Sequence, residues 1–226
     1  EKLGPDNACV FVELANDWID LNIAISDWYP RDELQTSLVY VDFSGLFKEI
    51  CWSQLLLFGG AYPILYRDLR FVWEWIFRAH YADRNSSGNP NDADPSGPTA
   101  DDKIAWLERR ERNLNWTNLI EPTLRLILPG SEHAHIGEHY RPLWDSLNQC
   151  VHPSATLRYR LVTESALLFT DSFDQTWAAE SVRAATDVFD LLWLAVMSRF
   201  PRSRFRLDRE RVFAFCPKAH AILETE

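Results

Sequence analysis

Apolar residues recur at helical spacing along most of the chain. The clearest run is near the C-terminus, where the apolar positions follow one another at steps of three and four: Ala178, Val182, Ala185, Phe189, Leu192, Val196 and Phe200. Charged residues fall on the other faces of this run, and Pro201 follows it. This spacing predicts one long amphipathic helix that ends at the proline.

Other segments show the same period. Residues 62–83 carry enough apolar side chains to predict a largely buried helix, with Pro63 in its first turn. Further helices are predicted over residues 101–114, over 117–128 with Pro122 in the first turns, and over 142–152 between two prolines. The first 45 residues are also expected to be helical, with a break at Tyr29-Pro30.

Strand-like alternation is scarce, and its best candidate is the short segment 211–215. Turn formers and acids fill residues 85–98, which predicts a long mobile loop near residues 84–100. We therefore expect an all-α helical bundle. It would form a single domain over residues 1–226, with a possible subdivision into 1–44, a core bundle at 45–200 and a basic C-terminal tail at 201–226.

Composition narrows the class of protein. The chain has 226 residues, 46% of them hydrophobic, which excludes a disordered protein, and its net charge of −10 argues against coating nucleic acid by charge alone. Four cysteines without a C-x-x-C pair suggest free thiols in a reducing compartment, so we expect a cytoplasmic protein. No segment is apolar enough for a membrane span, and no glycine-rich phosphate-binding motif predicts a cofactor.

A row of charges runs along the predicted helix 62–83. Arg67, Arg70, Glu74 and Arg78 follow at steps of three, four and four, and we call them the polar seam. Charges in a buried helix should be paired, because isolating one from water costs several kcal/mol. The seam is therefore either an ion ladder within the helix or the wall of a cleft. In a cleft, Arg70 and Arg78 would bind a ligand and Glu74 would be a candidate catalytic group.

A second polar row lies on the predicted helix 142–152. Asp145, Asn148 and His152 are spaced at i, i+3 and i+7, which puts them on one face. A histidine in a last helical turn can bind the terminal carbonyl groups and gain from the helix dipole. Alternatively, His152 is a general acid or base, with Asn148 orienting it or holding a phosphate.

These elements follow one another in a recognisable order. It begins with Leu69-Arg70-Phe71-Val72-Trp73-Glu74 before the predicted loop, continues through Lys103–Leu107 and Ile127–Gly130, and reaches Leu143-Trp144, Leu147-Asn148 and Val151-His152-Pro153-Ser154 before the long closing helix. Over residues 45–200 this order resembles uncharacterised helical proteins loosely grouped with the HEPN superfamily.

The resemblance implies a helical bundle that forms dimers, and many HEPN proteins are metal-independent endoribonucleases. Their signature, an arginine followed after four to six residues by a histidine, is absent here. The resemblance therefore favours a domain that binds RNA or a protein partner without the usual catalysis. One alternative is an endoribonuclease that uses His152 with Arg70 or Arg78. The other is a helical scaffold whose tryptophans anchor an oligomer interface.

Residues His135-Ile-Gly-Glu138-His139 match the H-x-x-E-H motif of one zinc-protease class. That motif needs a regular helix, whereas Gly137 falls inside it and a proline follows closely. We therefore expect a solvated loop and no structural metal, with an adventitious metal site at His135, Glu138 and His139 as the alternative.

Arginines concentrate near the C-terminus. Residues 199–211 hold six of them, with Phe200 and Phe205 interleaved, and we call this segment the basic patch. Arg202, Arg204 and Arg206 are the candidate contacts to phosphates, with stacking of bases on the aromatic rings. The alternative is a solvated helix end and linker.

Overall fold

The computed structural model of the protein describes residues 5–86, 98–110, 115–151, 175–208 and 212–224. Within these ranges every regular element is helical and no strand occurs, which confirms the all-α prediction. None of the described helices combines the length and apolar content that crossing a membrane requires.

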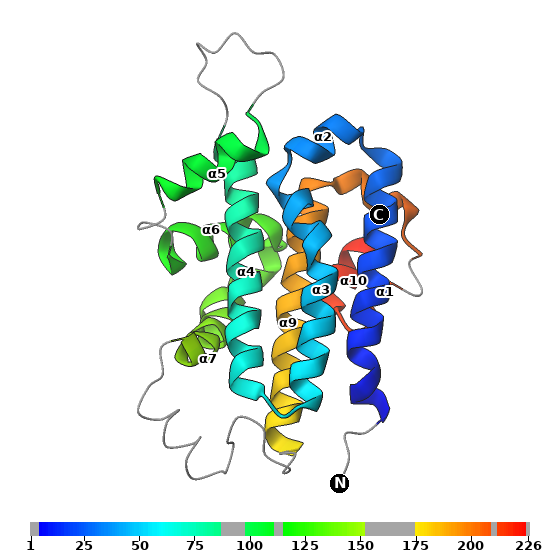
Figure 1. The fold of residues 1–226 in the computed structure, drawn as a ribbon, viewed down its shortest axis with the longest axis vertical. Coiled ribbons are helices and arrows are strands. Elements are labelled where there is room, and N and C mark those ends of the chain that lie inside the picture. The colour runs from blue at the N-terminus through cyan, green and yellow to red at the C-terminus, as the bar shows by residue number, and fades with distance from the viewer. Residues whose placement is uncertain (1–4, 87–97, 111–114, 152–174, 209–211, 225–226) are drawn as a thin grey trace.

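The helix α9 (Gln175–Arg199) forms the centre of the bundle (Figure 1). Every residue from Val188 to Met197 is buried, so this part of the helix is covered on all sides. The long helices α1 (Pro5–Trp28), α3 (Leu38–Phe58) and α4 (Tyr62–Asn85) run beside it. The predictions of a long closing helix and of a buried helix over 62–83 are confirmed.

Helices α3 and α4 form an antiparallel hairpin. The Gly59 N–H donates to the carbonyl of Leu55 at 2.9 Å and ends α3. Gly60 follows with a φ of 68°, in the left-handed region that favours glycine. Pro63 lies in the first turn of α4, as expected. This turn places the two helices side by side over most of their length.

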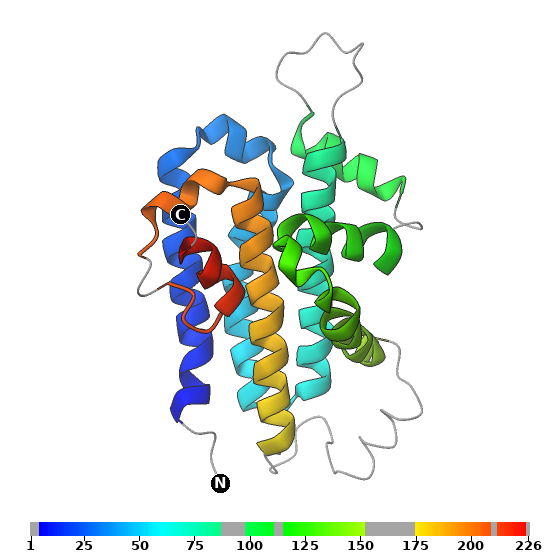
Figure 2. The same cartoon turned by 180° about the vertical axis from the view of Figure 1, so that it is seen from behind.

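Short elements cover the side of α4 away from α1 (Figures 1 and 2). They are α5 (Ala100–Glu108), the π-helical turn η2 (Trp116–Ile120), α6 (Glu121–Ile127), the 3₁₀ turn η3 (Gly130–Glu132), the π-helical turn η4 (Ile136–Tyr140) and α7 (Arg141–Val151). Tryptophan side chains connect these elements to α4: the Trp144 ring of α7 lies 5.2 Å from that of Trp73 on α4 and 5.9 Å from that of Trp116 on η2. The helix expected over 101–114 is shorter than predicted, and residues 111–114 lie outside the described ranges.

The N- and C-terminal elements close the other side of α9. They are α2 (Arg31–Thr36), the 3₁₀ segment η5 (Pro201–Arg206) and α10 (Pro217–Glu224). The Trp193 ring of α9 lies 6.1 Å from Phe43 and 6.2 Å from Phe213. Residues of the three proposed subdivisions therefore share one core.

The strand expected at 211–215 does not form over its described part, residues 212–215, which make a turn. Phe213 has a φ of 64°, and its N–H donates to Oδ1 of Asp17 at 2.8 Å. Asp17 of α1 thus accepts a hydrogen bond from a backbone N–H that a strand would donate to its neighbour in a sheet. The predicted loop near 84–100 is bounded by α4, which continues to Asn85, and by Thr99, which caps α5; residues 87–97 lie outside the described ranges.

A buried aspartate joins α3, α4 and α5. Asp83 of α4 accepts hydrogen bonds from the Leu38 N–H at 2.9 Å and the Val39 N–H at 3.2 Å, so it caps α3. It also accepts from the Ser37 hydroxyl at 2.5 Å and pairs with Lys103 of α5 at 2.8 Å. Burial would raise the pKa of Asp83, but the hydrogen bonds from Lys103 and Ser37 outweigh burial and hold that pKa below its usual value.

We expect Asp83→Asn to lower the free energy of unfolding by about 3 kcal/mol, because it leaves the Lys103 ammonium buried without a counter-charge. Asp145→Asn is the control, because Asp145 makes an exposed pair with Arg141 that contributes about 1 kcal/mol or less. Urea unfolding measures both changes. Equal losses in the two variants would contradict the structural role of Asp83.

Candidate functional site

The polar seam forms an ion ladder on α4. The carboxylate of Glu74 accepts hydrogen bonds from the Arg70 guanidinium and, at 3.0 and 2.6 Å, from Arg78. Arg67 is not part of the ladder, since it pairs with its neighbour Asp68 at 3.0 Å and is exposed. Glu74 therefore neutralises part of the charge of both candidate binding arginines.

Arg70 also joins α4 to α7. Its guanidinium carbon lies 3.3 Å from the centre of the Trp144 ring, a cation–π contact. Its Nε atom is buried and has no hydrogen-bond partner. Burial lowers the pKa of Arg70, and the Glu74 carboxylate opposes that change. The arginine is thus held between an acid and an indole ring.

The polar seam of α4 and the second polar row, on α7, are close to each other only around Arg70 and Asn148. Asn148 lies one helical turn after Trp144 on α7 and is half-buried. No hydrogen bond in the described ranges joins Asn148 to Arg70, Glu74 or Arg78, and Asp145 pairs with Arg141 at 3.0 Å. His152, the candidate acid or base, lies outside the described residues.

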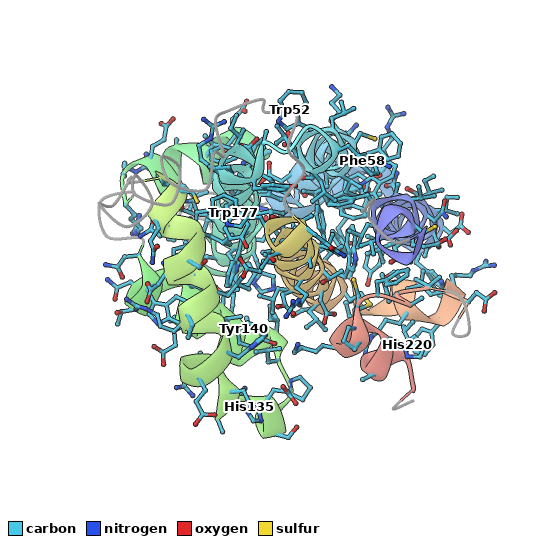
Figure 3. All side chains as sticks on the ribbon, turned by 90° about the horizontal axis from the view of Figure 1, so that it is seen from below. Trp52, Phe58, His135, Tyr140, Trp177 and His220 are labelled. Atoms are coloured by element: carbon cyan, nitrogen blue, oxygen red, sulfur yellow. The ribbon has the colours of Figure 1, made fainter. Side chains whose placement is uncertain are left out.

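The H-x-x-E-H segment runs through the π-helical turn η4 at the periphery of the molecule, where Figure 3 labels His135. The Nδ1 atom of His135 lies 3.8 Å from the Glu138 carboxylate, whereas His139 lies 3.5 Å from Asp187 of α9. Over the described ranges, no three His, Cys, Asp or Glu side chains are grouped to hold a metal ion.

Carboxylates surround much of the basic patch. Arg199 lies 3.6 Å from Glu33 and 3.5 Å from Asp83. The Nε of Arg204 donates to the carbonyl of Pro201 at 3.2 Å, while Arg202 is exposed. Two further arginines of the patch, Arg209 and Arg211, lie outside the described residues.

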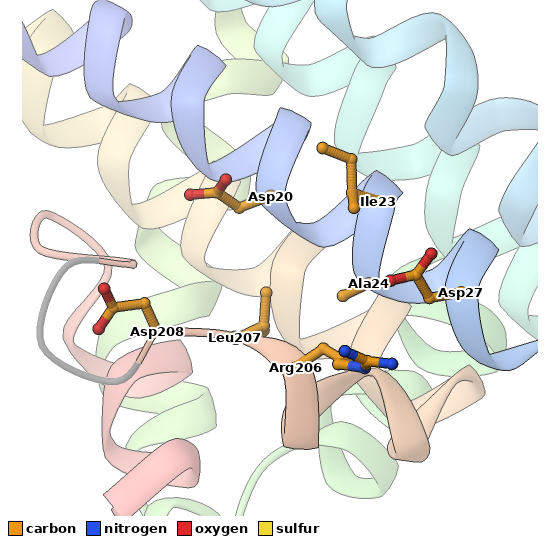
Figure 4. Close-up of a pocket in the computed structure, with 7 residues that line it drawn as sticks. All are labelled: Asp20, Ile23, Ala24, Asp27, Arg206, Leu207 and Asp208. Carbon is orange, nitrogen blue, oxygen red and sulfur yellow. The ribbon is translucent and has the colours of Figure 1, made fainter.

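Arg206 lines a hollow of about 220 Å³ between α1 and the end of η5 (Figure 4). Three carboxylates share the lining of this hollow: Asp20, Asp27 and Asp208. Their charges offset that of the arginine, so this part of the patch offers a phosphate little net attraction. The contacts of Arg202, Arg204 and Arg206 with nucleic acid remain predictions.

A group of exposed apolar residues on the α3–α4 hairpin was not predicted from the sequence. Trp52, Leu55, Phe71 and Trp75 are 47%, 63%, 60% and 43% exposed, and we call them the outer face. The rings of Phe71 and Trp75 lie 5.4 Å apart. Figure 3 shows Trp52 pointing away from the bundle, and its Nε1 donates to Asp68 at 3.0 Å. These residues fall off the apolar stripes of their helices, which is the signal that could have identified them.

Charges of both signs border the outer face. Lys48 and Glu49 lie one turn before Trp52 on α3, and Arg67 and Asp68 lie one turn before Phe71 on α4. Partial burial and the Asp68 charge raise the pKa of Glu49. The two acids therefore repel each other across the hairpin.

Two other carboxyl groups have pKa values raised by burial: Asp42 is half-buried and Asp190 is fully buried. Burial, reinforced by Asp83, raises the pKa of Asp42 to about 7, and burial raises that of Asp190 to about 6. Asp190 accepts hydrogen bonds from the Lys218 N–H at 3.1 Å and the Ala219 N–H at 2.7 Å, so it caps α10. Its contacts give Asp190 a structural role.

A scan against protein-family models finds none that matches the chain, and comparisons with curated proteins and with solved structures give no significant match either. The functional argument therefore depends on the chain's own geometry.

We expect Glu74→Gln to lower the free energy of unfolding by about 1–3 kcal/mol, because two partly buried guanidinium groups lose their counter-charge. The matched control is Glu121→Gln, which breaks an i, i+4 pair with the exposed Arg125 and should cost about 0.5 kcal/mol. Denaturant titration measures the free energy of unfolding of both variants. A loss for Glu74→Gln no larger than that for Glu121→Gln would contradict a stabilising role for the ion ladder.

Proposed function

We propose that the protein is a helical interaction module, and that its outer face binds the outer face of a second copy of the chain. The observation that carries this proposal is the cluster of four large, exposed apolar side chains on two adjacent helices. Scattered single apolar residues are normal on a protein surface, but four on adjacent helices, two of them in ring contact, are typical of an interaction site.

The size of the outer face supports a protein partner. Three aromatic rings and a leucine, each about half exposed, present on the order of 400 Å² of apolar surface. A stable interface buries about 800 Å² on each partner, with an apolar centre and a polar rim. The outer face would form this centre, and tryptophan is among the commonest anchors of such interfaces.

The charges favour a second copy as the occupant. In a two-fold interface each residue away from the axis meets a different residue of the other copy. Lys48 and Arg67 can therefore face Glu49 and Asp68 of that copy, which relieves the repulsion between the two acids. Two antiparallel helices packed on the same pair would make a four-helix arrangement.

Sedimentation velocity tests the assembly. The wild-type protein is expected to form dimers at micromolar concentration, and Phe71→Ser should raise the dimer dissociation constant about 30-fold or more. Phe205→Ser is the matched control, since Phe205 is 61% exposed against 60% for Phe71 but lies in η5.

Circular dichroism of both variants checks that the helices are retained. A wild-type protein that stays monomeric at high micromolar concentration would overturn the proposal, as would equal weakening by the two substitutions.

We propose RNA binding or cleavage at the α4–α7 joint as a second candidate function. It is supported by the contact of Arg70 with Trp144, which brings the polar seam within one helical turn of Asn148. The HEPN-like order of motifs implies His152 as the acid or base in that case. The pairing of Glu74 with both arginines is an argument for binding without cleavage.

We also propose a cytoplasmic location, which the four free cysteines support.

Incubation with single-stranded RNA in EDTA tests the second candidate. Cleavage that His152→Ala abolishes and His135→Ala retains is the result expected of a metal-independent nuclease. RNA binding that weakens steeply with salt, without cleavage, is the result expected of a binding domain. If the protein neither cleaves RNA nor binds it in a salt-dependent way, both forms of the proposal are excluded.

A further inference from the structure

We infer that the hollow between the end of α4 and the start of α6 binds a small organic anion, a carboxylate or a phosphate monoester, through His80 and Arg84. This inference is independent of the outer face, which lies on other surfaces of α3 and α4.

The hollow has about 300 Å³, at the lower end of the range for small-molecule sites. Its lining combines the polar side chains of His80, Arg84, Asn85 and Thr123 with the more apolar side chains of Tyr81, Pro122 and Leu126. Leu126 is 40% exposed, so an apolar body entering the hollow would cover it. This combination is typical of sites that bind an organic molecule with one charged end.

His80 carries the argument for a polar ligand. The residue is only 6% exposed, and no hydrogen bond from a described residue reaches its imidazole ring. The ring nitrogens of His80 are not among the fully buried polar atoms that lack a partner, so an incoming hydrogen-bonding group can reach the ring. An anionic oxygen can accept from the ring N–H, and protonation of the ring would add an ion pair.

The surrounding charges select an anion. Burial lowers the pKa of His80 to about 4; Arg84 and Arg199 act in the same direction and Asp83 opposes them. Asp83 is committed to Lys103 and the start of α3, and no carboxylate lines the hollow. In the described ranges no acid pairs with Arg84, which is exposed at the rim. With this pKa the His80 ring is neutral at pH 7, so among the described residues that line the hollow Arg84 alone carries a charge, and that charge is positive.

Nuclear magnetic resonance of the His80 ring provides the test. Benzoate and phenyl phosphate are the probes, because each joins an anionic end to a flat apolar body, and neutral benzamide is their control. Either anion is expected to raise the apparent pKa of His80 in a saturable way at millimolar concentration. The ratio of the two affinities identifies the preferred anionic group.

Arg84→Gln should weaken binding about tenfold or more, and Arg84→Lys should restore part of the affinity. Arg183→Gln, which removes another exposed arginine from α9, should leave it unchanged. The inference is overturned by no saturable change at His80, by equal affinity for benzamide, or by undiminished binding to the Arg84→Gln variant.

Discussion

The segment of α9 from Val188 to Met197 is buried around its whole circumference, and the rest of the structure is arranged to enclose it. The inner faces of α1, α3 and α4 pack on one side of it, and α6 and α10 approach from the other side (Figure 2). Because α3 and α4 bury one face each against this helix, their apolar residues on the opposite surface are left to solvent. The outer face is thus a consequence of how the core is built, and a partner is what would cover it.

Charged side chains connect the long helices to one another and to the segments packed around them. Asp83, Asp190 and Asp17 each lie on a long helix and accept backbone N–H groups of another element. Arg70 serves the same end by stacking on Trp144 of α7. Such interactions explain why conspicuous charges can be structural: the protein itself supplies most of the partners that these buried charged groups need.

Local periodicity predicted α4 and α9 well, because a regular apolar stripe depends only on spacing within one helix. The Glu74 ladder followed from the same spacing. The cap that Asp83 makes on α3 could not be predicted, since its partners lie some 45 residues away. The turn at Phe213 depends on a tertiary contact in the same way, because its amide donates to Asp17 of α1. The outer face was missed because the position of Trp52 and Phe71 off the apolar stripes of their helices was not used, and the packing that leaves them exposed is tertiary.

Oxidative footprinting at two protein concentrations tests the central claim, that the outer face is covered by a second copy. On going from nanomolar to high micromolar protein, we expect Trp52, Phe71 and Trp75 to become protected together, while Trp28 and Phe205 keep their reactivity. Unchanged reactivity of the outer face, or protection confined to Trp28 and Phe205, would contradict the account.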